Sequence, residues 1–147
     1  MKVLAVASGG GHWVQLRRTI PAFDGHEVVY LTIHPGYARD VPGARVHVVN
    51  DATRWDRWGS LVLALRVLWV LLRERPDVVI STGAAPGFFA IWLGRRLGAR
   101  TVWLDSIANV EAVSMSGRMV RRHAHLWLTQ WPHLAGPEGP EYAGRVF

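Results

Sequence analysis

Cysteine is absent from the sequence of 147 residues. Its absence excludes a disulfide scaffold, a thiolate metal site and a cysteine nucleophile. The sequence also has no Asp-x-Asp pair, so the usual carboxylate arrangement for a metal–diphosphate clamp is missing. We therefore expect neither a bound metal ion nor a cofactor.

Long hydrophobic runs are absent as well. The most apolar stretch, residues 60–72, is shorter than the ~20 residues that a membrane span requires, and Arg66 interrupts it. A strand pattern begins directly after Lys2, without the apolar stretch and cleavage site of a signal peptide. These features predict a cytosolic protein whose contact with a membrane, if it has one, is peripheral.

Lysine is nearly absent, because Lys2 is the only one among 17 cationic residues. The net charge is nevertheless +6, and arginine suits bidentate phosphate contacts better than lysine does. The eight tryptophans are many for this length, and indoles favour surfaces that are half wet and half apolar. This composition indicates an anionic partner, which is a phospholipid surface, a diphosphate substrate or a nucleic acid.

Short apolar segments alternate with helical patterns along the whole chain. We predict strands near residues 2–7, 27–32, 45–49, 77–82, 101–105 and 126–130, and helices near 12–20, 58–74, 86–97 and 115–123. This alternation is typical of an α/β fold with a Rossmann-like, doubly wound parallel sheet. Residues 1–135 are expected to form one domain and residues 136–147 an irregular tail rich in Gly and Pro.

A glycine-rich loop, Ser8-Gly9-Gly10-Gly11-His12, links the first strand to the first helix. The three glycines allow a ligand to approach the backbone, and the helix directs its positive dipole end at the loop. A dinucleotide-binding G-x-G-x-x-G would need glycine where Val14 stands, and a phosphate-binding G-x-x-x-x-G-K-[ST] is missing. The loop therefore predicts a site for an anionic or hydroxyl-bearing small molecule, or else a tight turn in which His12 is a local cap.

Two further loops end at the same edge of the predicted sheet, where ligands of such sheets bind. Small residues follow the fourth strand, and a carboxylate follows the fifth. We predict that these loops contact the ligand through Ser81, Thr82, Gly83, Asp105, Ser106 and Asn109. Asp105 or His12 could accept a proton from a substrate hydroxyl. The alternatives are close packing of helix on sheet for Ser81–Gly83, and a loop-stabilising acid for Asp105.

The helix predicted at 58–74 carries a second signal. At 100° per residue one face holds Leu61, Leu65, Leu68 and Leu72, which we expect to pack on the sheet. The other side mixes indoles with cations, as in helices that lie in lipid headgroups. We predict a membrane interface formed by Trp55, Trp58, Arg66, Trp69 and Arg73, with Arg54 and Arg57 beside it. The alternative is a buried crossover helix with snorkelling arginines.

Two other clusters lie near the predicted fourth helix. Arg118, with Arg121 and Arg122, could pair with phosphate. His123 and His125 would diverge on a helix, which argues against a zinc site.

Several motifs appear in order along the chain: Ser8-Gly9-Gly10-Gly11-His12, Ser81-Thr82-Gly83, Asp105-Ser106-Ile107-Ala108-Asn109-Val110, Ser114-Met115-Ser116-Gly117-Arg118 and Gln130-Trp131-Pro132. With these motifs the sequence resembles the oligosaccharide-biosynthesis family that includes the membrane-anchoring subunit of the eukaryotic split UDP-N-acetylglucosamine transferase. Bacterial relatives of that subunit serve capsule and exopolysaccharide assembly. The resemblance covers essentially the whole chain.

The resemblance implies the N-terminal, acceptor-side half of a GT-B glycosyltransferase that needs no metal. It also implies a heterodimer with a separate donor-binding subunit, held in part by the tail, at the cytoplasmic face of the plasma membrane. The eukaryotic members carry an N-terminal anchor that is not found here, so attachment is expected through residues 54–75 or through a partner. Asp105 stands where glutamate is expected.

The function that follows is transfer of a sugar from a UDP-sugar (UDP-GlcNAc, UDP-glucose or similar) to a polyprenyl-diphosphate-linked saccharide. In this prediction the glycine loop holds the acceptor, and the chain is inactive without its partner. The alternative is a non-catalytic membrane adaptor that recruits a soluble glycosyltransferase. No recognition-helix or stacking-strand motif is found, so we expect no nucleic-acid partner.

Overall fold

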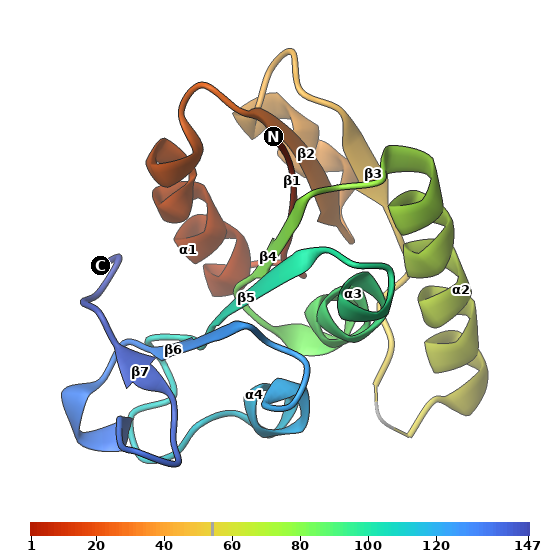
Figure 1. Ribbon diagram of the computed structural model, residues 1–147. Helices are drawn as coiled ribbons and strands as arrows, with labels where there is room; N and C mark the ends of the chain where they lie inside the picture. The colour runs from red at the N-terminus through yellow and green to blue at the C-terminus, as the bar shows by residue number, and fades with distance from the viewer. Residues whose placement is uncertain (54) are drawn as a thin grey trace.

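A computed structural model describes residues 1–53 and 55–147 (Figure 1). The described residues form a seven-stranded sheet in the order β3-β2-β1-β4-β5-β6-β7, and every strand pair is parallel. The strands are β1 (Lys2–Val6), β2 (Glu27–Thr32), β3 (Val46–Val48), β4 (Val78–Ser81), β5 (Arg100–Leu104), β6 (Leu126–Thr129) and β7 (Glu141–Tyr142). The helices are α1 (Gly11–Thr19), α2 (Arg57–Glu74), α3 (Ala84–Arg96) and α4 (Met115–Val120).

The central strands are buried on both faces, as their unbroken apolar runs predict. Leu4 and Val6 of β1 pack with Leu63 and Val67 of α2 in one layer of the core. Val3 and Ala5 of the same strand pack with Trp13 and Leu16 of α1 in the other layer. Figure 1 accordingly shows α1 on one side of the sheet and α2 and α3 on the other.

The prediction of an irregular tail is wrong at Glu141–Tyr142. These two residues form β7, which pairs with Leu128 and Thr129 of β6 at the edge of the sheet. A strand of two residues is too short to show a hydrophobic periodicity in the sequence. It is defined only by its pairing with β6. The third helix also starts earlier than predicted, at Ala84 rather than at Pro86.

The prediction for the buried face of α2 is wrong as well. Leu61, Leu65 and Leu72 are about half exposed, whereas Leu63 and Val67 are fully buried. Apolar residues surround the whole helix, so hydrophobic periodicity does not choose a face. Glu74 lies on the buried stripe of α2 and is held there by ion pairs, whereas Arg66 and Arg73 are exposed.

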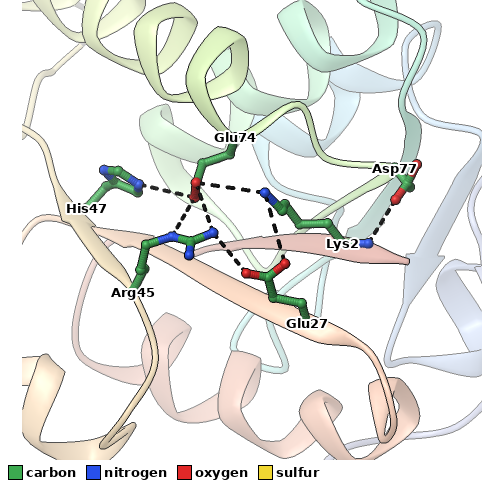
Figure 2. Close-up of polar contacts among 6 residues, drawn as sticks. All are labelled: Lys2, Glu27, Arg45, His47, Glu74 and Asp77. Atoms are coloured by element: carbon green, nitrogen blue, oxygen red, sulfur yellow. Dashed lines mark hydrogen bonds and ion pairs between the residues drawn. The ribbon is translucent and has the colours of Figure 1, made fainter.

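The ion-pair cluster around Glu74 lies where α2 ends, beside the amino-terminal halves of the first strands (Figure 2). Arg45 donates to Glu74 from Nε at 3.1 Å and lies 2.9 Å from Glu27. Lys2 Nζ is 4.0 Å from both carboxylates, and His47 Nε2 is 3.5 Å from Glu74. Burial raises the pKa of the Glu74 carboxyl, but hydrogen bonds and charges from Arg45, His47 and Lys2 outweigh it and leave the pKa below its usual value.

The other end of α2 is fixed by a cap. The Asp56 side chain accepts a hydrogen bond from Gly59 N at 2.8 Å and so satisfies a free N–H of the first turn. Within the part of the chain that the structure describes, no helix combines the length and the apolar character needed to cross a membrane.

Candidate functional site

Three loops meet at the carboxyl edge of the sheet. They follow β1, β4 and β5, which are consecutive neighbours in the sheet order. The first leads into His12 at the start of α1, the second contains Thr82 and the third Asp105. Because parallel strands end at the same edge, the topology brings together the residues that the sequence analysis proposed.

His12 is held by a reciprocal pair of hydrogen bonds with Thr82. The His12 Nδ1 atom is 2.9 Å from the Thr82 carbonyl oxygen, and Thr82 Oγ1 donates to the His12 carbonyl oxygen at 2.6 Å. A carbonyl oxygen only accepts, so Nδ1 of the neutral ring carries the hydrogen. Nε2 is then the atom with the lone pair, and it can accept a proton. Thr82 is fully buried, whereas His12 is half-buried.

Gly83 provides the space for the His12 ring. Its φ is +146°, and a Cβ at this position would lie 2.4 Å from His12 Cε1 and Nδ1. The next residue, Ala84, has a φ of +67°, which is uncommon for a residue with a side chain. Ser81 Oγ accepts from Gly83 N at 3.1 Å, and this bond fixes the turn. The small residues of this loop thus seat the histidine against the start of α3.

A wall formed by Tyr37 and His34 flanks the glycine loop. Gly10 N donates to Tyr37 Oη at 2.8 Å, and Gly10 has a φ of +58°. A Cβ on Gly9 would lie 2.9 Å from His34 Cδ2 and 3.3 Å from Tyr37 Oη. The Tyr37 ring also stacks on Trp13 of α1, with centroids 4.8 Å apart. One backbone N–H of the glycine loop, which was predicted to bind an anionic or hydroxyl-bearing ligand, is therefore already bonded within the chain.

Tyr37 and His34 were not predicted from the sequence as part of the site. The signal in the sequence for these two residues is their position. The segment after β2 starts at the same edge of the sheet as the glycine loop, since β2 lies beside β1 and runs parallel to it.

Asp105 is the buried centre of the third loop and is only 1% exposed. Its carboxylate accepts from Trp103 Nε1 at 3.0 Å and from Asn109 Nδ2 at 3.1 Å. Ser114 donates to it from its backbone N at 2.9 Å and also from its hydroxyl. Both oxygen atoms are thus engaged, and they tie β5, the loop and the first residue before α4 together. This arrangement fits the alternative given for Asp105 from the sequence, namely an acid that stabilises the loop.

Gln15 and Gln130 lie beneath the third loop; Gln15 was not singled out from the sequence, and Gln130 was noted only as part of the Gln130-Trp131-Pro132 motif. Gln15 Nε2 donates to Ser106 Oγ at 3.1 Å, and Gln130 Nε2 donates to the Asp105 carbonyl oxygen at 3.0 Å. Glutamine is ordinarily an exposed residue, so sequence alone gives no reason to place either one in the core.

The remaining predicted residues lie at the surface. Arg118 is exposed one turn into α4, which begins beside Asp105 through the Ser114 cap. Trp58 is 79% and Trp69 56% exposed, and Trp55, Arg66 and Arg73 are exposed too. The Arg73 guanidinium lies 5.4 Å from the centre of the Trp69 ring. The prediction for Arg54 falls outside the described residues.

Across residues 1–53 and 55–147, no cluster of three or more His, Cys, Asp or Glu residues could hold a metal ion.

A scan against models of known protein families finds no match. Among curated proteins, the chain is 28% identical over 102 residues to the UDP-N-acetylglucosamine transferase subunit alg14 of Schizosaccharomyces pombe. It is 33% identical over 91 residues to the subunit ALG14 of Mus musculus. The resemblance inferred from the sequence is confirmed, but over part of the chain rather than over essentially the whole of it. These matches cover 64% and 56% of this chain, and 48% and 37% of the relatives, so the chain spans less than half the length of the ALG14 subunits.

Solved structures show the fold. The chain matches MurG of Acinetobacter baumannii with a TM-score of 0.80 at 13% identity, over 97% of this chain and 45% of that one. It matches the UDP-N-acetylglucosamine 2-epimerase of Rickettsia bellii with a TM-score of 0.72 at 14% identity, over 99% and 45% of the two chains. The α/β Rossmann-like fold is therefore confirmed, and it is the fold of just under half of the MurG chain.

Proposed function

We propose that this chain is the acceptor-binding, membrane-associating subunit of a two-component glycosyltransferase. The complex would transfer a sugar from a UDP-sugar to a polyprenyl-diphosphate-linked saccharide. The similarity to ALG14 subunits supports the assignment to a split UDP-N-acetylglucosamine transferase, and the likeness to MurG supports a GT-B architecture. The observation that carries the proposal is the fixed orientation of His12 at the carboxyl edge of the sheet.

His12 is the general base of this proposal. Its Nδ1–H is bonded to the Thr82 carbonyl, which leaves Nε2 as the proton acceptor for the attacking hydroxyl of the acceptor sugar. Deprotonation of that hydroxyl lets its oxygen attack the anomeric carbon of the donor, and UDP leaves with the bonding electrons. The N-terminus of α1 and the backbone of the glycine loop would face the diphosphate of the acceptor, with Arg118 as a further phosphate contact.

Asp105 acts in this proposal by positioning the loop rather than by taking the proton. A carboxylate that already accepts from Trp103, Asn109 and Ser114 would have to break these bonds before it bound a substrate hydroxyl. Asn109 and Ser106 are then loop residues whose backbone and side chains shape the wall of the site. Ser81, Thr82 and Gly83 act in this proposal by seating His12 rather than by touching the ligand, since Ser81 and Thr82 are fully buried.

Membrane association would use the exposed face of α2. That face carries Trp58, Leu61, Leu65, Trp69 and Leu72, each of them about half exposed or more. It is more apolar than the sequence analysis expected, since the leucines predicted for the core lie there. Arg66 and Arg73 add cations that suit anionic headgroups. The acceptor would reach the site from this surface at the cytoplasmic side.

The donor half is the proposed partner of the heterodimer. MurG is more than twice as long as its matched segment, and the matched part corresponds to nearly all of this chain. Groups that stabilise the departing UDP would come from the partner. Tyr142 and Phe147 leave exposed apolar surface near the end of the sequence, and we include this tail in the partner-facing surface.

The test reconstitutes the pair. The chain is co-expressed with a candidate donor-binding subunit encoded beside it, and transfer from UDP-GlcNAc and UDP-glucose is assayed on membranes. Neither subunit alone should transfer sugar, and the pair should. His12→Ala should lower the rate of the pair by about 10²- to 10⁴-fold, the usual contribution of a general base. Turnover by this chain alone would overturn the split site.

The matched control is His26→Ala, because His26 lies at the opposite edge of the sheet beside the N-terminal amine of Met1. This variant should keep full activity. If His12→Ala keeps full activity as well, the chain is a non-catalytic adaptor that recruits a soluble glycosyltransferase.

A further inference from the structure

Two buried glutamines connect the candidate site to the last residues of the sequence. Gln15, on α1, is 2% exposed, and Gln130, after β6, is fully buried. Buried amides are stable only when their donors and acceptors are satisfied, so the partners of these two side chains define what the pair holds together.

Gln15 uses all of its hydrogen-bonding capacity. Nε2 donates to the Gly11 carbonyl oxygen at 3.2 Å and to Ser106 Oγ at 3.1 Å. Oε1 accepts from Ile107 N at 3.0 Å and from Gln130 Nε2. A flipped amide would place donors against donors, so the network fixes its orientation. Gln15 therefore locks the third loop to the helix that carries His12.

Gln130 carries the network on to the tail. Its Nε2 donates to Gln15 and to the Asp105 carbonyl oxygen, while its Oε1 accepts from Val146 N at 3.0 Å. Val146 is thus bonded directly to the amide that orients Gln15. Nearby, Trp131 Nε1 donates to the Ile107 carbonyl oxygen at 2.7 Å, which secures the same loop from β6.

The second polar group of Val146 is held by α1. Arg18 Nη1 donates to the Val146 carbonyl oxygen at 2.9 Å, and the Arg18 guanidinium lies 4.1 Å from the centre of the Phe147 ring. Both backbone groups of Val146 are therefore bound by side chains, one of them buried. Arg18 belongs to the same helix as His12 and Gln15.

We propose that the segment of residues 143–147 is a positioning element for the site, and that Gln130 is the positioning residue through which it acts. Val146 N satisfies Gln130 Oε1. Gln130 then holds Gln15 and the Asp105 carbonyl, and Gln15 holds Ile107 against α1. Loss of the tail contact leaves a buried acceptor unsatisfied and loosens the loop beside His12. A partner that binds the tail would act on the geometry of the loop by this route. The consequence for sugar transfer rests on the proposed function, but the coupling itself does not.

The experiment removes one donor and leaves the core intact. Val146→Pro deletes the N–H that bonds Gln130, and Val146→Ala is the matched control that keeps it. Amide hydrogen exchange of the full chain is followed by NMR at Ile107, with Leu4 in β1 as the internal reference. Val146→Pro should speed exchange at Ile107 by about tenfold, because one lost bond shifts a local opening equilibrium by roughly that factor. Val146→Ala should leave it unchanged.

Arg18 gives a second test from the surface. Arg18→Ala should speed exchange at Ile107 in the same way, and Arg18→Lys, which can still donate to the Val146 carbonyl, should restore protection. Arg17→Ala on the same helix is the control. Unchanged exchange at Ile107 in Val146→Pro, or equal acceleration at Leu4, would overturn the proposal. The pair is then assayed: a lower kcat with an unchanged KM for the UDP-sugar extends the coupling to catalysis. Faster exchange with unchanged turnover would support the coupling and overturn the role of this loop in transfer.

Discussion

At the scale of single residues, the site depends on positions where a side chain is not tolerated. Gly83 is the sharpest of them, because its φ of +146° and its contact with the His12 ring both require glycine. Gly117 has a related role, since a Cβ there would lie 2.7 Å from Asp105 Oδ1. These glycines allow the chain to pack His12 and Asp105 closely against the turns that orient them.

Gly83→Ala should therefore displace His12. We expect a loss of about 2–4 kcal/mol in the free energy of unfolding, from backbone strain and overpacking together. Transfer by the reconstituted pair should fall to the level of His12→Ala. Denaturant unfolding followed by circular dichroism measures the first effect and the transfer assay the second.

Gly98→Ala separates strain from contact. Gly98 has a φ of +92°, but a Cβ there would have no heavy atom within 4 Å. This variant should lose only about 1–2 kcal/mol and keep its activity. An active Gly83→Ala would show that the His12 ring does not need the seat that the structure gives it.

At the scale of elements, α2 buries a stripe that contains one ion-paired carboxylate and leaves an apolar face exposed. Leu63 and Val67 form the buried stripe with Glu74, and the ion pairs of Glu74 hold this stripe toward the sheet. Trp58, Leu65 and Trp69 are left on the outer face. An exposed apolar face of this size on a helix with arginines is typical of an interfacial element.

The double variant Trp58→Ala/Trp69→Ala should weaken binding to vesicles that contain anionic phospholipid. Two indoles removed from the lipid boundary should lower the bound fraction at least tenfold, since each contributes on the order of 1 kcal/mol or more. Flotation of the purified chain measures this fraction. Tyr142→Ala, which removes an exposed aromatic ring from the edge strand β7, should float like the parent chain. If the double variant floats unchanged, α2 does not face the membrane.

At the scale of the whole molecule, the carboxyl ends and the amino ends of the parallel strands carry different groups of residues. The carboxyl edge carries the loops of the candidate site. Toward the other edge, the cluster of Lys2, Glu27, Arg45, His47 and Glu74 joins the first three strands to the end of α2 (Figure 2). Changes in this cluster should alter stability without altering the chemistry of the site.

Acid should destabilise the fold through Glu74. Its pKa in the folded chain is below the ordinary value of 4.5, so its contribution to stability is present above that value. The contribution is lost as the pH falls through the folded pKa, because the unfolded chain binds the proton more readily. Glu74→Gln should cost about 1.5–3 kcal/mol at neutral pH, the scale of a hydrogen bond to a charged group. It should also reduce the loss of stability on acidification.

Urea unfolding at neutral pH and at pH values below about 4.5 measures both effects. The control is Glu111→Gln, which changes an exposed carboxylate in a loop. An equal loss of stability on acidification in the parent chain and in Glu74→Gln would exclude Glu74 as the acid-sensitive group.

The sequence by itself determined the alternation of strands and helices, the edge at which the loops gather, and the placement of His12, Thr82 and Asp105 at that edge. These follow from local patterns, because buried strands and glycine turns have signatures within a few residues. The parallel arrangement of the strands then brings the loops that follow them to one edge of the sheet. The assignment of roles to the site residues stays a prediction.

Only the tertiary structure decided the rotation of α2, the pairing of β7, the wall of Tyr37 and His34, and the burial of Gln15 and Gln130. Each depends on a partner far away in the sequence: Arg45 for Glu74, Leu128 for Glu141, Gly10 for Tyr37, and Val146 for Gln130. The glycine loop and its histidine are legible from the sequence, whereas the contacts that orient His12 exist only once distant segments pack together.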